Sequence, residues 1–179
     1  MENYTKSHWR DAAAGGASLG VAIALFSVAA GLLGLYERAP WAISTFNFAA
    51  IAVSVYVFGQ RRAVRYGERG FSYGQSLAFI ASMMLFAGFI AGVGNFVTYR
   101  WVIADYYANY IDEYLGAVTA GMGTALPKGG EEMIRTVMNS PLVIIFSTLF
   151  NIVVYGVFIG LVASVFIKRP EGTLTRNGE

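Results

Sequence analysis

The sequence contains no cysteine, a single histidine (His8) and few charged residues, which make up 13% of its 179 positions. The absence of cysteine excludes a disulfide framework, a thiolate metal site and a thiol nucleophile. Soluble domains average about 25% charged residues, so the charged share here is about half the usual one. The net charge of +2 is too small to indicate a nucleic-acid partner.

The shortage of charge is local, because four long uncharged runs alternate with short charged stretches. The runs cover about 12–36, 41–60, 72–99 and 141–167. Each reaches the roughly 20 residues that a helix needs to cross about 30 Å of hydrocarbon. We therefore expect an all-α integral membrane four-helix bundle, a single domain over 1–179, with an external amphipathic helical cap over 100–140 between the third and fourth spans.

The basic residues predict how the bundle is oriented. Nine of the thirteen Lys and Arg residues flank the spans on one side: Lys6, Arg10, Arg61, Arg62, Arg65, Arg69, Lys168, Arg169 and Arg176. The positive-inside rule then places both termini in the cytoplasm. Four spans agree with this, because an even number of spans leaves both termini on the same side.

The sequence also marks where helices begin and how they pack. Pro40, the possible capping box Ser72–Gln75 and the pair Ser140–Pro141 precede the second, third and fourth spans. Small-residue pairs of the Gly-x-x-x-Gly type occur in three spans: Gly16 and Gly20, Gly88 and Gly92, Gly156 and Gly160. Such pairs let helix backbones approach closely in lipid, and packing within the chain is favoured over a dimer interface.

Inside the spans, the polar side chains of interest are amides. No Asp, Glu, Lys, Arg or His lies well inside a span, whereas Asn47, Asn95 and Asn151 each occupy one. Counted at 1.5 Å per residue, all three lie roughly 6 to 15 Å below the same boundary, and Ser27 has a similar depth. We expect a polar cluster there. Hydrogen bonding between helices is the favoured role, and a substrate site is the alternative.

The stretch YRWVIADYYANYIDEYLG predicts an external helix over Ile103–Val118, with its acids on one face. The aromatic face, Tyr106, Tyr107, Tyr110 and Tyr114, suits the headgroup level of a membrane, and stacking on a ring-shaped ligand is the alternative. The helix either continues the third span or bends onto the membrane surface. A flexible stretch over 119–130 and a short helix over Glu131–Met138 are expected to follow.

The order of these features resembles a known family. The basic loop leads into GFSYGQSLAF (Gly70–Phe79), followed by the Tyr/Asp-rich external helix, an N-x-P-L element (Asn139–Leu142) and the ending ASVFIKRP (Ala163–Pro170). This combination is similar to the bacterial membrane proteins grouped as the domain-of-unknown-function family numbered 4199. The resemblance implies a bacterial inner-membrane protein with four helices, and it brings no established activity, cofactor or catalytic residue.

For function, the sequence favours a non-enzymatic protein, because its spans offer no group for acid–base or nucleophilic chemistry. No catalytic residue, cofactor or metal site is expected. The favoured role is a scaffold, accessory or regulatory component of a membrane assembly, with membrane lipid and a homo-oligomer or larger complex as partners. The alternative is a small transporter or channel whose asparagines face a cavity.

Overall fold

The computed structural model describes residues 2–66, 70–122 and 129–168. The secondary-structure elements in this part of the chain are all helices. They are α1 (Glu2–Leu32), α2 (Leu35–Arg38), α3 (Pro40–Tyr66), α4 (Tyr73–Val97), a π-helical turn (Thr98–Val102), α5 (Ala104–Met122), α6 (Gly130–Met138) and α7 (Pro141–Ile167). Four of them are long and apolar enough to cross a membrane, within Ser7–Leu32, Pro40–Arg65, Tyr73–Val102 and Pro141–Ile167. The protein is therefore a helical membrane bundle, as the sequence predicts.

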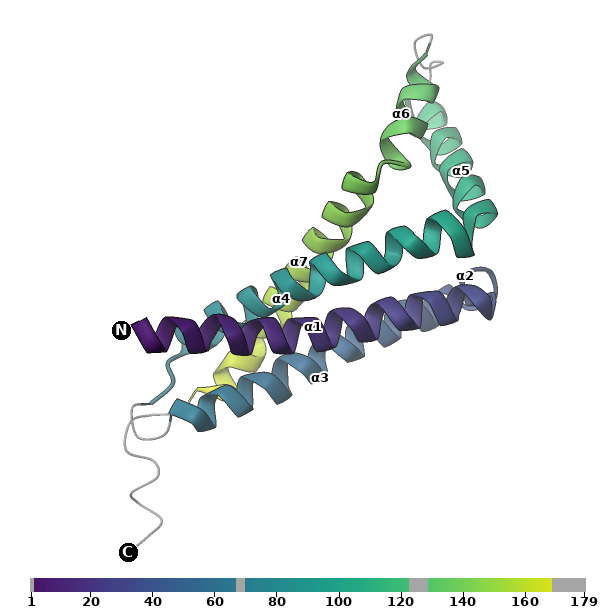
Figure 1. Ribbon diagram of the computed structural model, residues 1–179. Coiled ribbons are helices and arrows are strands. Elements are labelled where there is room, and N and C mark those ends of the chain that lie inside the picture. The colour runs from purple at the N-terminus through teal and green to yellow at the C-terminus, as the bar shows by residue number, and fades with distance from the viewer. Residues whose placement is uncertain (1, 67–69, 123–128, 169–179) are drawn as a thin grey trace, which may run out of the picture.

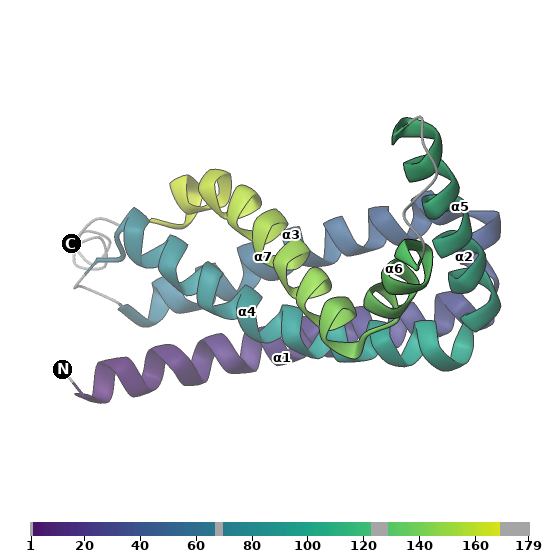
Figure 2. The ribbon, with the colours of Figure 1, turned by 90° about the horizontal axis from the view of Figure 1, so that it is seen from above.

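The bundle has two distinct ends (Figure 1). At one end, here called the terminal end, α1 begins and α7 finishes. At the other, called the cap end, α5 and α6 project away from the spans. Helices α1, α3 and α4 run alongside one another, and α7 crosses them obliquely (Figure 2). The oblique course brings α7 close to α3 near the terminal end, where Gly59 faces the Ile167 side chain.

Helix α4 is the centre of the bundle, packing against α1 on one side and α7 on the other. The glycines of the three Gly-x-x-x-Gly pairs lie at these two contacts. A Cβ atom added at Gly16 or Gly20 would lie 2.4 Å or 2.7 Å from a carbonyl oxygen of α4. One added at Gly88 would lie 2.8 Å from the Cα of Leu149 on α7. The absence of side chains lets the helix backbones touch, which supplies the packing that holds helices together in lipid.

The other three glycines complete the contact between α4 and α7. Gly92 lies against the Ile145 backbone, while Gly156 and Gly160 receive the side chains of Met84 and Ile80 from α4. Each of the six glycines thus packs against a neighbouring helix of the same chain. Helices α3 and α7 are less buried than the other two spans. In the most apolar segment of each span, 17% of the residues are buried in α3 and in α7, against 39% in α1 and 44% in α4.

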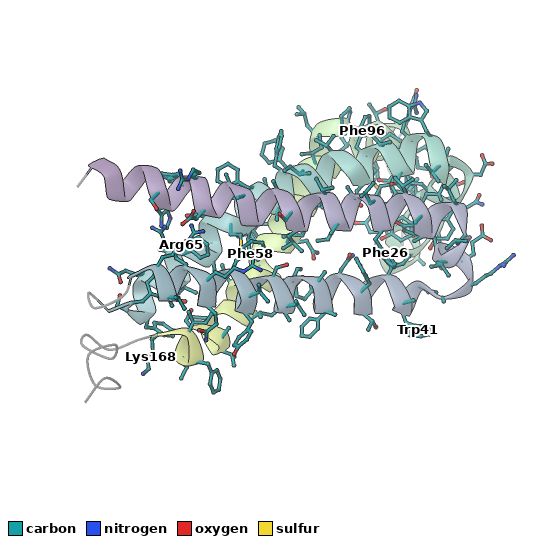
Figure 3. The ribbon with its side chains drawn as sticks, turned by 60° about the horizontal axis from the view of Figure 1, so that its bottom comes forward. Phe26, Trp41, Phe58, Arg65, Phe96 and Lys168 are labelled. Atoms are coloured by element: carbon teal, nitrogen blue, oxygen red, sulfur yellow. The ribbon has the colours of Figure 1, made fainter. Side chains whose placement is uncertain are left out.

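At the terminal end a polar clasp joins α1 to α3. The Asp11 carboxylate accepts hydrogen bonds from Arg62 Nη1 at 2.5 Å and Arg65 Nη1 at 2.7 Å. Arg62 also donates to Ser7 Oγ at 2.8 Å, and its side chain is buried. Figure 3 shows Arg65 and Lys168 at this end and Trp41 at the other. The helices extend further than the uncharged runs indicate, since α1 begins at Glu2 and α3 includes Arg61, Arg62 and Arg65, which the sequence places in a loop. Arg69 of that loop lies outside the described residues.

The helix starts agree with the sequence signals. Ser72 accepts from the Gln75 backbone and the Gln75 side chain returns the bond, which confirms the capping box at the start of α4. Helix α3 begins at Pro40, and α7 begins at Pro141 with Ser140 as its N-cap. Proline is tolerated there because the first turn of a helix needs no N–H donor.

The cap does not continue the third span in a straight line. A π-helical turn follows Val97, and Ile103, with φ −126° and ψ 39°, interrupts the helix before α5 leaves at a new angle (Figure 1). The predicted flexible stretch over 119–130 is wrong in its first part, because α5 remains helical to Met122. A single glycine such as Gly121 costs a helix only about 1 kcal/mol, which the rest of the helix absorbs. Residues 123–128 of that stretch lie outside the described part.

Candidate functional site: a polar cavity between α3 and α7

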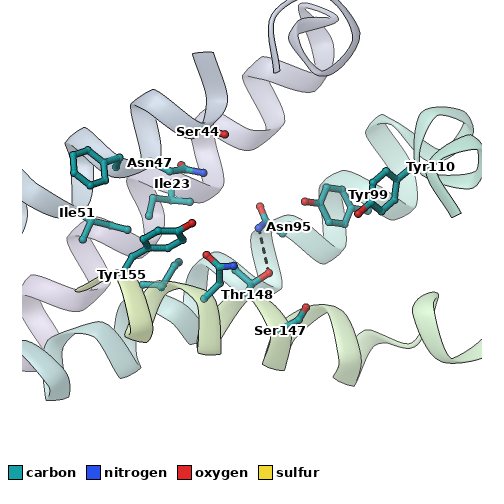
Figure 4. A pocket seen from close by; sticks show the side chains of 13 residues that line it. Ile23, Ser44, Asn47, Ile51, Asn95, Tyr99, Tyr110, Ser147, Thr148 and Tyr155 are labelled. Atoms are coloured by element: carbon teal, nitrogen blue, oxygen red, sulfur yellow. Dashed lines mark hydrogen bonds between the residues drawn. The ribbon is translucent and has the colours of Figure 1, made fainter. Parts of the chain in front are cut away.

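A cavity of about 670 Å³ lies between α3, α7 and the cap end of α4 (Figure 4). All of its lining residues except Tyr110 belong to the candidate spans, so the cavity lies at the depth of the bilayer. It is lined by Ile23, Ser44, Asn47, Phe48, Ile51, Asn95, Tyr99, Tyr110, Ser147, Thr148, Asn151, Ile152 and Tyr155. The three asparagines singled out from the sequence therefore line one space, although they come from three different helices.

Asn95 is the amide that holds helices together. Its Oδ1 accepts from Ser27 Oγ of α1 at 2.8 Å, and its Nδ2 donates to Thr148 Oγ1 of α7 at 3.3 Å (Figure 4). Ser27 also lies 2.6 Å from the hydroxyl of Tyr36, so that hydroxyl donates when the Ser27 proton points at Asn95. This chain of bonds joins α1, α2, α4 and α7, and it uses both polar atoms of the Asn95 side chain.

Asn47 and Asn151 have a different environment. Asn47 Oδ1 is buried and has no hydrogen-bond partner among the described residues. Asn151 is exposed on the cavity side of α7, and the structure gives it no bond to another described residue. An amide oxygen removed from water without a partner carries a free-energy cost of about 1 to 3 kcal/mol. A molecule in the cavity, water included, can bond to the exposed Asn151 amide.

The four tyrosines of the external helix separate into different environments. Tyr107 stacks on Tyr99 at 4.7 Å between ring centroids, and its hydroxyl donates to the Met138 carbonyl at 2.9 Å. Tyr106 packs near Tyr36 at 5.8 Å. Tyr110 lines the cavity, and Tyr114 lines a groove between α5 and α6. The four residues share one side of α5 but contact different parts of the molecule.

Burial changes the chemistry of one of these phenols. Removal from water raises the pKa of Tyr107 above its usual value, and the neighbouring Tyr110 raises it further. Tyr107 therefore stays protonated at neutral pH and remains a donor to Met138, which anchors α5 to the residue that ends α6.

Several lining residues were missed by sequence reasoning, although a signal for them exists. Ser44 lies three positions before Asn47, and Ser147, Thr148 and Tyr155 lie four before, three before and four after Asn151. Positions three or four apart share one face of a helix. Hydroxyl residues at that spacing from an intramembrane asparagine would have extended the predicted cluster to these positions.

Comparison with known proteins adds one match. A family model described as "Protein of unknown function (DUF4199)" matches residues 15–169, which include the whole cavity, the second, third and fourth spans, and the first span from residue 15 onward. No curated protein and no solved structure matches the chain.

Proposed function

Because the chain belongs to the family of proteins of unknown function DUF4199, we propose its function from the cavity: a non-enzymatic membrane protein that binds a small molecule between α3 and α7. The volume of about 670 Å³ lies in the range of roughly 300–1,000 Å³ that is usual for ligand pockets. A receptor, a carrier or a channel-like protein would each use such a site.

One observation carries this proposal: three asparagines face one cavity at bilayer depth, but only Asn95 has both polar atoms hydrogen-bonded to other helices. If the cluster served only to join helices, its amides would bond to one another or to facing side chains. Asn47 and Asn151 instead line a space large enough for a ligand and have no hydrogen bond to another described residue. Polar groups kept at such depth are commonly functional.

The lining supports binding without catalysis. It contains no carboxylate, histidine, lysine or arginine, and the sequence has no cysteine. The serine and tyrosine hydroxyls there have no base beside them to activate them as nucleophiles. Hydrogen bonding and shape are what these side chains offer.

An accessory role in a membrane assembly is the second candidate. It is favoured by the exposure of polar residues such as Ser147 and Asn151 on α7, since a partner helix could cover them. The glycine faces are already occupied within the chain, so this partner, a second copy or another protein, would use α3 and α7.

For location, we propose a bacterial inner membrane with both termini in the cytoplasm. Arg61, Arg65 and Lys168 are exposed at the terminal end, and basic residues favour the cytoplasmic side. The cap would then lie on the outer side.

The test is purification of the full chain in a mild detergent, followed by mass spectrometry under non-denaturing conditions. We expect a small molecule of defined mass to remain bound, and Asn151→Leu to lose it while Thr45→Val, an exposed change on α3 outside the cavity, keeps it. A bound protein at fixed stoichiometry would favour the second candidate. A monomer that carries nothing, in the wild type and both variants, would contradict the proposal.

A further inference from the structure

We infer that the ligand is an uncharged amphiphile, with a hydrogen-bonding head group held by the asparagines and an apolar chain pointing toward the membrane centre. This inference rests on the proposed function and names the class of molecule that the cavity accepts. It follows from the order of side chains along the cavity, the position of its opening and the absence of charge.

The lining changes from polar to apolar along the bundle. On α3, which runs from the cap end, Ser44 and Asn47 precede Phe48 and Ile51. On α7, which runs the same way, Ser147 and Thr148 precede Ile152. The change from Ser44 to Ile51 occupies about 10 Å of helix. Apart from the Tyr155 hydroxyl, which lies beyond Ile152 on α7, the amides and hydroxyls therefore lie toward the cap end and the isoleucines lie deeper.

This order matches that of a lipid in the leaflet on the cap side. A lipid of that leaflet has its polar group toward the cap end and its hydrocarbon toward the membrane centre. In the cavity, Asn95 and Tyr99 lie at the cap end of α4, and Ile23 and Ile51, both buried, lie at the deep end beside Tyr155 (Figure 4). A molecule from that leaflet would enter without turning over.

The opening of the cavity faces the hydrocarbon. Phe48 of α3 is 57% exposed and Tyr155 of α7 is 52% exposed, although both line the cavity and belong to spans. Nearer the terminal end the same two helices come together, where Gln60 donates to the Phe166 carbonyl at 3.3 Å. The gap between α3 and α7 thus opens sideways toward the cap end, so that a ligand enters from lipid.

The head group carries no charge, because the lining contains no Asp, Glu, His, Lys or Arg that could pair with one. A buried ion without a partner would be strongly disfavoured at this depth. The exposed amide of Asn151, together with the hydroxyls of Ser44 and Ser147, offers the ligand both donors and acceptors. A hydroxyl or a primary amide satisfies these groups, whereas an ester alone provides no donor.

Three probes with the same oleoyl chain separate these requirements: monooleoylglycerol, methyl oleate and oleoyl-lysophosphatidylglycerol. The purified full chain is titrated with each probe and examined by non-denaturing mass spectrometry. We expect monooleoylglycerol to bind about tenfold more tightly than methyl oleate, which has no donor, and than the phosphate-bearing probe. Asn47→Leu and Asn151→Leu should each weaken monooleoylglycerol by about tenfold, and Thr45→Val should not.

Equal binding of the three probes, or unchanged binding in both asparagine variants, would overturn the inference. A co-purified molecule that is water-soluble and is lost in Asn151→Leu would also overturn it, while the proposed function would stand. If no probe binds and nothing co-purifies, the inference and the proposed function fail together. Because Asn151 is exposed, its replacement tests binding without risk to the fold.

Discussion

Asp11 of α1 accepts a hydrogen bond from Arg62 of α3 at 2.5 Å, and the Arg62 side chain is only 4% exposed. Asp11→Ala would remove the carboxylate from this buried guanidinium. We expect Asp11→Ala to lower the free energy of unfolding by about 3 kcal/mol, measured by denaturant titration in a mild detergent. Arg65, the second donor to Asp11, is 62% exposed, so Arg65→Ala should cost less than about 1 kcal/mol. Equal losses in the two variants would show that burial of Arg62 does not matter.

The contact between α4 and α7 depends on the absence of a side chain at Gly88. A Cβ atom there would lie 2.8 Å from Leu149 Cα, so the helices must separate to admit it. Gly88→Ala should destabilise the bundle by about 1–3 kcal/mol. Gly116→Ala is the matched control on α5, because no atom lies within 4 Å of its added Cβ, and it should be neutral or stabilising by up to about 1 kcal/mol. Thermal unfolding of both variants decides the matter, and the same loss in each would contradict packing as the cause.

The asparagines should differ in what they contribute to stability. Asn95→Leu removes the bonds to Ser27 and Thr148, and we expect a loss of about 1 kcal/mol. Asn151→Leu removes no bond to a described residue and should leave the unfolding midpoint unchanged or raised. If both variants lose the same stability, hydrogen bonding between helices is the role of the whole cluster, and the binding site loses its main support.

The cap is expected to lie at the membrane boundary with the groove between α5 and α6 toward lipid. That groove is apolar, lined by Tyr114, Val118, Met133, Ile134, Val137 and Met138. Because the chain has no native cysteine, a spin label can be placed at Met133→Cys, which is 70% exposed, or at Glu132→Cys as the control. In vesicles, oxygen should relax the label at 133 more strongly, and a water-soluble nickel chelate the label at 132. The opposite ranking would place the groove in water.

The spans and the helix starts could be predicted from sequence because they depend on local properties. A run of about 20 apolar residues fixes a span, and Ser72 and Gln75 form their capping box within one turn of helix. The membrane depth of Asn47, Asn95 and Asn151 is also a local property, because it depends only on the number of residues between each asparagine and the end of its span.

What the sequence could not provide depends on how the helices are arranged. Which asparagine bonds to Ser27 depends on how α4 packs against α1, and which asparagines line the cavity depends on the oblique course of α7; no residue spacing encodes either. The ion pair between Asp11 and Arg62 joins residues far apart in the chain. The sequence alone does not decide whether the helix bends at Ile103, because YRWV can extend a helix as readily as interrupt it.

Tyr110 belongs to two parts of the molecule at once. It lines the intramembrane cavity, and it is a residue of α5, where its ring lies 6.3 Å from that of Tyr107. Tyr107 in turn stacks on Tyr99, which lines the same cavity. A molecule that fills the cap end of the cavity therefore contacts α5 directly, through Tyr110. We therefore expect binding in the cavity and the orientation of α5 to depend on each other.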